Sequence, residues 1–399
     1  MLTNRELFQL HLGQTSSSPM MVEIVRADGV YMYSPDGKKY LDMISGVSVS
    51  NTGHSHPRVI KAVKKQVDSY MHLMVYGEII QSPQVKYAER LAKLLPLQLN
   101  TTYFVNSGSE AVEGAMKLAK RYTGRGRIIS FKNSYHGSTH GALSIQGSEL
   151  YRNAFRPLLP DTFQIGFNDE KSLGMIDNKT ACVIIEPIQG EAGVIYPEND
   201  FLKKLRDRCN STGALLIFDE IQTGFGRTGF MFAIDRFGVI PDILLLAKAL
   251  GGGMPLGAFI SSNEIISALI SNPPLGHITT FGGHPVCCAA GLASLNVIVD
   301  EDLVTTCKSK SDLFRKELNH PLISEIRGEG LFIAVQLTDS ESVKYVISHA
   351  TDYGLILDYF LFCDNAFRIA PPLIINEDEI VWACQQVIKI LDDAMQNAK

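Results

Sequence analysis

The sequence predicts an α/β protein with a mainly parallel central sheet in a large domain and a smaller α+β domain beside it. The chain has 399 residues, which is more than one small hydrophobic core usually organises. Short aliphatic runs alternate with amphipathic stretches through the middle of the chain, as in repeated strand and helix units. These runs are apolar at consecutive positions, which is typical of strands covered on both faces.

Six of these runs are expected to be the strands of the large domain: residues 103–105, 127–131, 182–185, 215–218, 243–246 and 257–261. The first 50 residues differ, because turn signals separate short strand-like pieces at 29–33 and 39–41, which predicts a small antiparallel element. The end of the chain returns to an α+β pattern. There the expected elements are helices at 286–299, 309–318 and 377–395 and a strand at 331–337.

These patterns divide the chain into three expected sections. Residues 1–50 are an N-terminal segment that joins the small domain, residues 51–290 are the large domain, and residues 291–399 are the C-terminal small domain. In a parallel sheet of this kind, ligands bind outside the carboxyl ends of the strands. The residues that follow each expected strand are therefore the candidates for ligand binding and catalysis.

Composition excludes several classes of protein. Hydrophobic residues make up 45% and charged residues 20% of the chain, as in ordinary globular proteins. The net charge of -5 leaves no excess of basic residues for a phosphate backbone, so nucleic acid is not an expected partner. The sequence shows neither an apolar run that would span a bilayer nor a secretory signal, so we expect no membrane association and a cytoplasmic location. Seven cysteines without a C-x-x-C pair favour reduced, buried thiols.

The segment after the first expected strand has two interpretations. It reads Asn-Ser-Gly-Ser-Glu-Ala over residues 106–111 and precedes an amphipathic helix. Ser107 and Glu110 have the spacing of a capping box, which accounts for both residues. The small residues Ser107, Gly108 and Ser109 equally suit a phosphate seat, because backbone N–H groups of a first helical turn bind anions.

The segment after the second strand contains Tyr135, His136 and a glycine. A loop tyrosine followed by glycine is able to stack on a planar ligand ring, although such tyrosines also cover core edges. His136, like His54 and His56, has no carboxylate or cysteine at ligand spacing. No metal site is therefore expected.

Two strand ends carry charged residues. Asp219 follows an entirely apolar strand, and Lys248 follows the next one, 29 positions later (248 − 219). An acid buried there needs a cation or a donor, and a lysine with apolar walls has a depressed pKa and a nucleophilic amine. Pyridoxal phosphate requires such a pair, a lysine for its aldehyde and a carboxylate for its ring nitrogen. The alternative for Lys248 is a snorkelling or salt-bridged side chain.

The chain resembles the class III pyridoxal-phosphate aminotransferases, which include the acetylornithine, ornithine and 4-aminobutyrate enzymes. The motifs that carry the resemblance are FVNSGSEA at 104–111, EPIQGE at 186–191, FDEIQTGFGRTG at 218–229, Lys248 before ALGGG, and TFGGHP at 280–285. The match extends from residues 37–42 to residues 368–373. It implies a fold type I transferase with bound pyridoxal 5'-phosphate.

The resemblance also implies a role for each cofactor residue. Lys248 forms the Schiff base and shuttles the substrate proton, and Asp219 pairs with the ring nitrogen. Gln222 bonds the phenolic oxygen, while Tyr135 and Ile221 cover opposite faces of the ring. The phosphate seat takes the group's phosphate through Gly108 and Ser109. Thr280 reaches the phosphate of the neighbouring subunit, so the resemblance implies a homodimer with shared active sites.

Substrate residues follow in the same way. Arg368 is similar to the family's carboxylate clamp, since a guanidinium matches a carboxylate bidentately, and the family pairs it with the glutamate found here as Glu191. Two readings stay open, a switch that frees Arg368 for a 2-oxo acid or a permanent ion pair. Ser138 stands where several members carry an arginine, which indicates a neutral, wider donor pocket.

The expected reaction is transamination, from an amine or amino-acid donor (an ω-amine in particular) to a 2-oxo acid such as 2-oxoglutarate or pyruvate. An aminomutase or a decarboxylating relative is the alternative, because the same lysine and acid serve those reactions. A dehydrogenase fits poorly, since no strand-linked G-x-G-x-x-G is present. A binding protein without catalysis would leave the paired acid and lysine unexplained.

Overall fold

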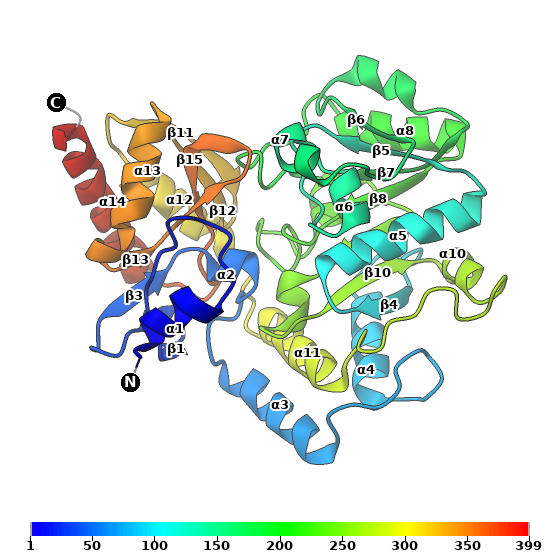
Figure 1. Cartoon of the computed structure of the whole chain (residues 1–399), viewed down its shortest axis with the longest axis horizontal. Coiled ribbons are helices and arrows are strands. Elements are labelled where there is room, and N and C mark those ends of the chain that lie inside the picture. Colours follow the sequence, from blue (N-terminus) through cyan, green and yellow to red (C-terminus); the bar gives the residue numbers. More distant parts are fainter. Residues whose placement is uncertain (1, 398–399) are drawn as a thin grey trace.

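The large domain is built on a seven-stranded sheet. The computed structural model describes residues 2–397 (Figure 1). The sheet order is β4-β10-β9-β8-β7-β5-β6, and only β10 runs antiparallel to its neighbours. This confirms the predicted mainly parallel sheet. Its strands are β4 (Thr101–Val105), β5 (Arg127–Phe131), β6 (Thr162–Ile165), β7 (Thr180–Ile185), β8 (Leu215–Asp219), β9 (Ile243–Leu246) and β10 (Gly257–Ser261).

Both faces of this sheet are buried, which explains the continuous apolar runs. Alternate residues of one strand belong to different hydrophobic clusters: Ile217 packs with helix α5 (Gly108–Thr123), whereas Leu216 packs with helix α8 (Phe201–Thr212). Strand β6 was not predicted. It is an edge strand with partly exposed residues and therefore lacks an uninterrupted apolar run.

The C-terminal part forms a second, antiparallel sheet of order β11-β12-β15-β14. A third sheet, β1-β2-β3-β13, joins both ends of the chain, because β13 pairs with β3. The strands are β11 (Ile323–Glu329), β12 (Phe332–Leu337), β14 (Asp358–Phe360) and β15 (Cys363–Ile369), then β1 (Arg26–Asp28), β2 (Tyr31–Tyr33), β3 (Lys39–Asp42) and β13 (Leu355–Ile356).

Four longer helices complete the C-terminal half: α11 (Pro285–Asp300), α12 (Thr306–Glu317), α13 (Ser340–His349) and α14 (Glu377–Asn397). The predicted boundary near residue 290 lies inside α11, which packs against α3 (Pro57–Ser69) and α4 (Ser82–Ala92). The domain limits stay a prediction. The shorter helices are α1 (Asn4–His11), α2 (Ser45–Ser48), α6 (His140–Ser144), α7 (Glu149–Arg152), α9 (Ala233–Phe237) and α10 (Asn263–Ile266), with 3-10 turns η1 (Asn153–Phe155), η2 (Glu170–Met175), η3 (Lys248–Gly251), η4 (Ser267–Leu269) and η5 (Ala350–Tyr353).

A buried arginine ties the parts together. The guanidinium of Arg227 donates to the carbonyl oxygens of Leu331 (3.0 Å) and Pro371 (2.5 Å) and to Asn51 Oδ1 (2.5 Å). Burial lowers the pKa of Arg227 to about 10. Arg227 Nη2 also donates to Ser45 Oγ at 3.4 Å, so this large-domain arginine contacts both the N-terminal segment and the C-terminal part. Across residues 2–397, no helix has the length and apolarity needed to cross a bilayer.

Candidate active site

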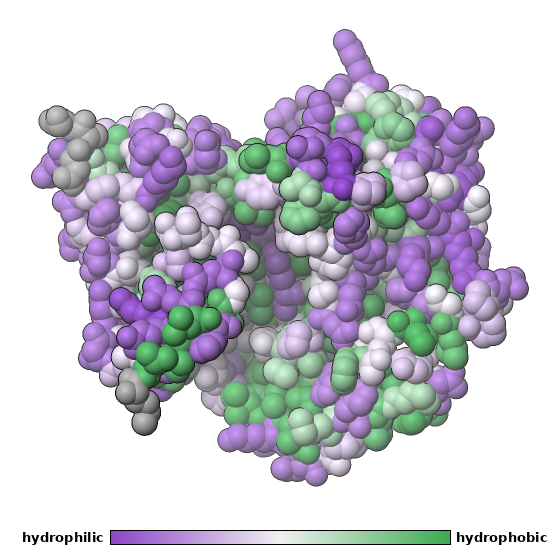
Figure 2. Space-filling view, viewed as in Figure 1, coloured by the Kyte–Doolittle hydropathy of each residue, from purple (hydrophilic) through white to green (hydrophobic). Residues whose placement is uncertain are grey.

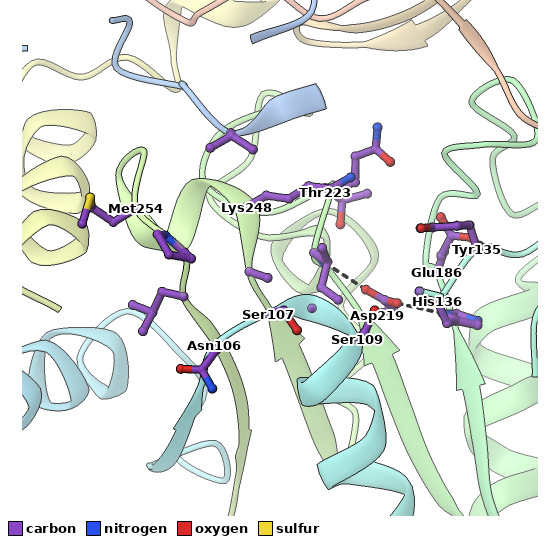
Figure 3. A pocket seen from close by; sticks show the side chains of 18 of the residues that line it. Asn106, Ser107, Ser109, Tyr135, His136, Glu186, Asp219, Thr223, Lys248 and Met254 are labelled. Carbon is purple, nitrogen blue, oxygen red and sulfur yellow. Dashed lines mark hydrogen bonds and ion pairs between the residues drawn. The ribbon is translucent and has the colours of Figure 1, made fainter. Parts of the chain in front are cut away.

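A cavity of about 370 Å³ lies at the carboxyl edge of the large sheet (Figure 3). Its walls come from the segments that follow β4, β5, β7, β8 and β9, as expected for an α/β sheet. The structure brings most of the predicted site residues together there: Ser107, Gly108, Ser109, Tyr135, Asp219, Ile221, Gln222 and Lys248. Three predicted residues, Glu191, Arg368 and Thr280, lie outside this lining.

Asp219 ends strand β8 and is 4% exposed. Its Oδ2 is hydrogen-bonded to Nδ1 of His136 at 2.7 Å, and its Oδ1 accepts the backbone N–H of Ile221 at 3.1 Å. The other ring nitrogen of His136 is buried and has no partner within the described chain. Sequence reasoning considered His136 only as a metal ligand and missed this contact, which joins residues 83 positions apart.

Lys248 begins the η3 turn directly after β9 and Ala247. Its φ of +50° lies in the left-handed region, a strained conformation for a residue with a side chain. Burial lowers the pKa of Lys248 to about 8, while the nearby charge of Glu191 opposes this shift and that of Arg368 reinforces it. The amine is therefore more readily neutral than that of a surface lysine.

The first turn of α5 makes up one wall. Ser107 is its N-cap, and the Ser107 hydroxyl accepts the backbone N–H of Glu110 at 3.2 Å. The Glu110 carboxylate bonds the backbone and side chain of Asn106, both at 2.8 Å, so only half of the predicted capping box forms. Because first-turn N–H groups have no partner inside a helix, they remain available to an anion. Capping and a phosphate seat are thus compatible.

A second buried acid, Glu186, joins two loops of the site. Its Oε1 accepts the N–H of Tyr135 and its Oε2 accepts the N–H of Gly190, each at 2.9 Å. Burial raises the pKa of Glu186 to about 7, and His136 opposes the shift. Sequence reasoning quoted this residue in a motif but assigned it no role. The contact is long-range, because it pairs residues 51 positions apart.

Glu191 and Arg368 form a buried ion pair between the large domain and strand β15. Arg368 Nη2 donates to Glu191 Oε1 at 2.6 Å, and the arginine is 1% exposed. The charge of Glu191 raises the pKa of Lys248 and that of Arg368 lowers it. The guanidinium of the predicted carboxylate clamp is thus already occupied by an acid.

A family model described as aminotransferase class-III matches residues 12–391. The chain belongs to the class III aminotransferases. It is 39% identical to the acetylornithine aminotransferase of Methanopyrus kandleri over 97% of this chain and 98% of the relative. It is 37% identical to the ornithine aminotransferase of Macrococcus caseolyticus over 95% of this chain and 96% of the relative. These matches confirm the family that the motifs indicated.

Solved structures agree with this class III aminotransferase fold. An ornithine aminotransferase from Toxoplasma gondii, described with partial occupancy of PLP at its active site, superposes with a TM-score of 0.89 at 30% identity, covering 98% of this chain and 94% of its own. A thermostable omega transaminase from Pseudomonas jessenii superposes at 0.91 with 28% identity, covering 98% of both chains. The fold is therefore that of fold type I transaminases, and the enzyme depends on pyridoxal 5'-phosphate.

The donors and acceptors of this aminotransferase fit that cofactor. The cavity combines an anion seat, the Asp219 carboxylate and the Lys248 amine, and two of its buried nitrogens, Gln222 Nε2 and His136 Nε2, have no partner in residues 2–397. Gly137 adopts a φ of +121°, and a Cβ there would collide with the hydroxyl of Ser109. The loop of Tyr135 is thus held close to the anion seat.

The pKa of Lys248 leads to a first prediction for this aminotransferase. The rate of cofactor capture by the apoenzyme should rise about tenfold for each pH unit as the pH increases toward 8 and should level off above pH 8, because only the neutral amine attacks an aldehyde. Stopped-flow absorbance after mixing apoenzyme with cofactor measures this rate from pH 6.5 to pH 9. A rate that is flat across pH 8 would contradict the assignment.

Thr280 and Ser138 are both exposed in this aminotransferase. Thr280 is exposed, in the loop between β10 and α11, and lies away from its own chain's cavity. Ser138 is also exposed, and its hydroxyl lies 3.2 Å from that of Tyr135. The position where several family members carry an arginine is therefore neutral here.

Proposed function

We propose that this enzyme transfers an amino group from an amine or amino-acid donor, an ω-amine in particular, to a 2-oxo acid such as 2-oxoglutarate or pyruvate. The observation that carries the proposal is the buried Glu191–Arg368 pair, together with the buried Lys248 amine whose pKa both charges affect. Transamination requires an amine that moves protons, which Lys248 supplies. A site that binds an amine and a 2-oxo acid in turn also requires a cation for the oxo-acid carboxylate that is neutralised while the amine is bound, and Arg368 paired with Glu191 meets this requirement.

The residues of the cavity support separate tasks. When bound, pyridoxal phosphate supplies an electron sink for the substrate carbanion. The Lys248 amine would take the proton from the substrate carbon and deliver it to the cofactor carbon. Asp219, oriented by His136, offers a carboxylate to the ring nitrogen. Tyr135 and Ile221 provide the walls between which a planar ring fits.

The remaining cofactor contacts are polar. We assign the phosphate to the first turn of α5, where Ser107 is the N-cap. Ser107, Gly108 and Ser109 offer backbone N–H groups and hydroxyls to an anion there. We assign the phenolic oxygen to the buried Gln222 Nε2. An unpaired buried donor costs about 1–3 kcal/mol, which a ligand acceptor recovers.

We propose that Glu191 acts as a switch. It neutralises Arg368 while a donor without a carboxylate is bound, and it moves aside when the oxo acid brings a carboxylate. In Glu191→Ala, the half-reaction with such a donor should slow about tenfold, because a bare buried cation then faces the cationic amine. The 2-oxo acid half-reaction should change less than about threefold.

Single-turnover absorbance of the bound cofactor measures each half-reaction separately. The matched control is Glu198→Ala, which removes an exposed acid from the same long loop. Unchanged half-reactions for every donor in Glu191→Ala would indicate a permanent structural ion pair instead.

Titration of the holoenzyme with a panel of amines tests the function itself. Bleaching of the visible cofactor absorbance by one amine, and its return with one oxo acid, identifies both substrates. Retention of the nitrogen without an acceptor would select an aminomutase, and release of carbon dioxide would select a decarboxylase. Acetylornithine and ornithine belong in the panel, since the relatives carry those names, but the neutral Ser138 favours other ω-amines.

We also propose a homodimer with shared sites. Large hydrophobic side chains are exposed around α3, α4 and the segment between them, where Figure 2 shows hydrophobic residues gathered on the lower part of the molecule. They include Met71, Met74, Ile80 and Val85, with Ile80 93% exposed. Ile278 and Phe281, which flank Thr280, are exposed as well. Such a patch marks a protein interface, and a second copy there would receive Thr280.

Mixing two inactive variants tests the shared site. Refolding Lys248→Ala chains with Thr280→Ala chains should restore up to about a quarter of the wild-type activity, because about half of the dimers are heterodimers and each heterodimer contains one site with both residues intact. Thr280→Ala refolded alone is the control for its residual activity. An absence of any recovery in verified heterodimers would exclude a site shared through Thr280. The cytoplasmic location stays a prediction.

A further inference from the structure

The turn that carries Thr280 is anchored on the wall of its own chain's cofactor cavity. Asn106, the residue before the anion seat, makes two hydrogen bonds with one side-chain nitrogen. Its Nδ2 donates to Glu110 Oε2 and to Thr279 Oγ1, each at 2.8 Å. A carboxylate only accepts, so Glu110 fixes which end of the Asn106 amide faces Thr279. The residue directly before Thr280 is therefore held by a side chain of the cofactor site.

The same turn also packs on the end of strand β4. A Cβ on Gly282 would collide with the Phe104 carbonyl oxygen and with the side chain of Thr279, so the turn lies tightly against the strand. Gln84 Nε2, on α4, donates to the carbonyl oxygen of Gly283 at 2.5 Å. The backbone of the turn is thus held from its own subunit, while Thr280 remains exposed.

The bond between Asn106 and Thr279 connects two cavities. Asn106 lines the cavity that contains Lys248 (Figure 3), whereas Thr279 lines a separate cavity of about 360 Å³ whose walls include Ile80 and Val85. Those two side chains belong to the exposed hydrophobic patch that we assigned to the subunit interface. The bond therefore runs from the wall of one cofactor site to the surface on which a second copy would lie.

We propose that Asn106 is a positioning residue that acts on the cofactor site of the partner subunit. By holding Thr279, it fixes the backbone from which Thr280 reaches the neighbouring phosphate site. The inference rests on the shared dimer proposed above and names the residue that orients its shared contact. Loss of the bond should weaken cofactor binding in the neighbouring subunit, because the residue contributed to that subunit is no longer held in place.

The test uses heterodimers in which only one subunit is able to capture the cofactor. The first chain carries Lys248→Ala and one affinity tag, the second chain keeps Lys248 and carries another tag, and purification on both tags isolates the mixed dimer. After removal of bound cofactor, pyridoxal phosphate is added at increasing concentration and reduced with borohydride. Mass spectrometry of the Lys248 peptide then gives the concentration for half labelling. A change in the first chain that shifts this concentration acts across the interface.

Asn106→Ala in the first chain should raise the half-labelling concentration by about threefold to tenfold, the range for one lost hydrogen bond. Thr279→Val in the first chain removes the same bond at a residue outside the cofactor cavity and should have the same effect. The matched control is Thr279→Ser, which keeps the hydroxyl and should stay within about twofold of the parent heterodimer. Thr280→Ala in the first chain measures the full effect of the shared contact.

An unchanged concentration with Asn106→Ala and Thr279→Val, beside an increase with Thr280→Ala, would overturn the role of Asn106 alone. An equal increase with Thr279→Ser and Thr279→Val would also overturn it, because packing and not the bond would then hold the turn. No increase with Thr280→Ala would overturn the shared site itself. Labelling needs no amine substrate, so these outcomes are independent of transamination. Thermal unfolding of each heterodimer within a few degrees of the parent shows that a shift is not lost folding.

Discussion

Lys248→Ala is expected to lower turnover by at least about a thousandfold, since proton transfer and nucleophilic activation are lost together. Among the described residues that line the cavity, no second lysine is present to replace it, and Arg368 is paired with Glu191. Cofactor binding should persist more weakly, because the anion seat and Asp219 are unchanged. The measurement is kcat with the best donor from the amine panel, beside cofactor affinity by absorbance titration.

The matched control is Lys203→Ala, which removes a surface lysine paired with Asp200 and should leave kcat unchanged. Borohydride reduction of the wild-type holoenzyme should attach the cofactor to the peptide that contains Lys248. Attachment elsewhere, or more than about a tenth of wild-type turnover in Lys248→Ala, would refute the assignment.

Asp219→Asn is expected to cause the second large loss of kcat. The amide cannot hold a proton on the ring nitrogen, so kcat should fall by about a thousandfold or more, as when a preorganised charge is removed from a site. Cofactor affinity should fall only about tenfold to a hundredfold, the range for one charge-assisted hydrogen bond. Pre-steady-state rates and cofactor titration separate the two.

A comparison with His136→Asn shows how Asp219 is held. That change removes the 2.7 Å bond to Asp219 but leaves the carboxylate and its bond from Ile221, so kcat should fall only about tenfold. Equal losses in the two variants would mean that orientation, not charge, is what Asp219 supplies. If Asp219→Asn lowered the affinity for the cofactor without lowering kcat, Asp219 would contribute to cofactor binding and not to the chemical step.

The strands and their end residues were predictable because their signals are local. A strand buried on both faces needs consecutive apolar residues, so a charge directly after it stands out. Asp219 and Lys248 are of this kind, and both line the cavity. Ser107 was also visible locally, since a cap and its helix are neighbours in sequence. The edge strand β6 was not predicted, because its residues are only partly buried and it therefore lacks a run of consecutive apolar residues.

The contacts that orient these groups were not predictable from spacing. His136 and Glu186 contact residues that lie far away in sequence, and each contact depends on which strands are adjacent. The order β8-β7-β5 brings the loops of Asp219, Glu186 and Tyr135 together. Nothing in the composition of a single strand specifies its neighbours.

The amino-acid sequence alone therefore determined the kind of sheet, the lysine and acid at its strand ends, and the family to which they belong, because burial and capping act over a few residues. Only the tertiary structure decided that Glu191 is paired with Arg368, that His136 is bonded to Asp219, and that Glu186 joins the loops of Tyr135 and Gly190. These are electrostatic contacts between distant segments, and their strength depends on distance and burial that exist only after the chain has folded.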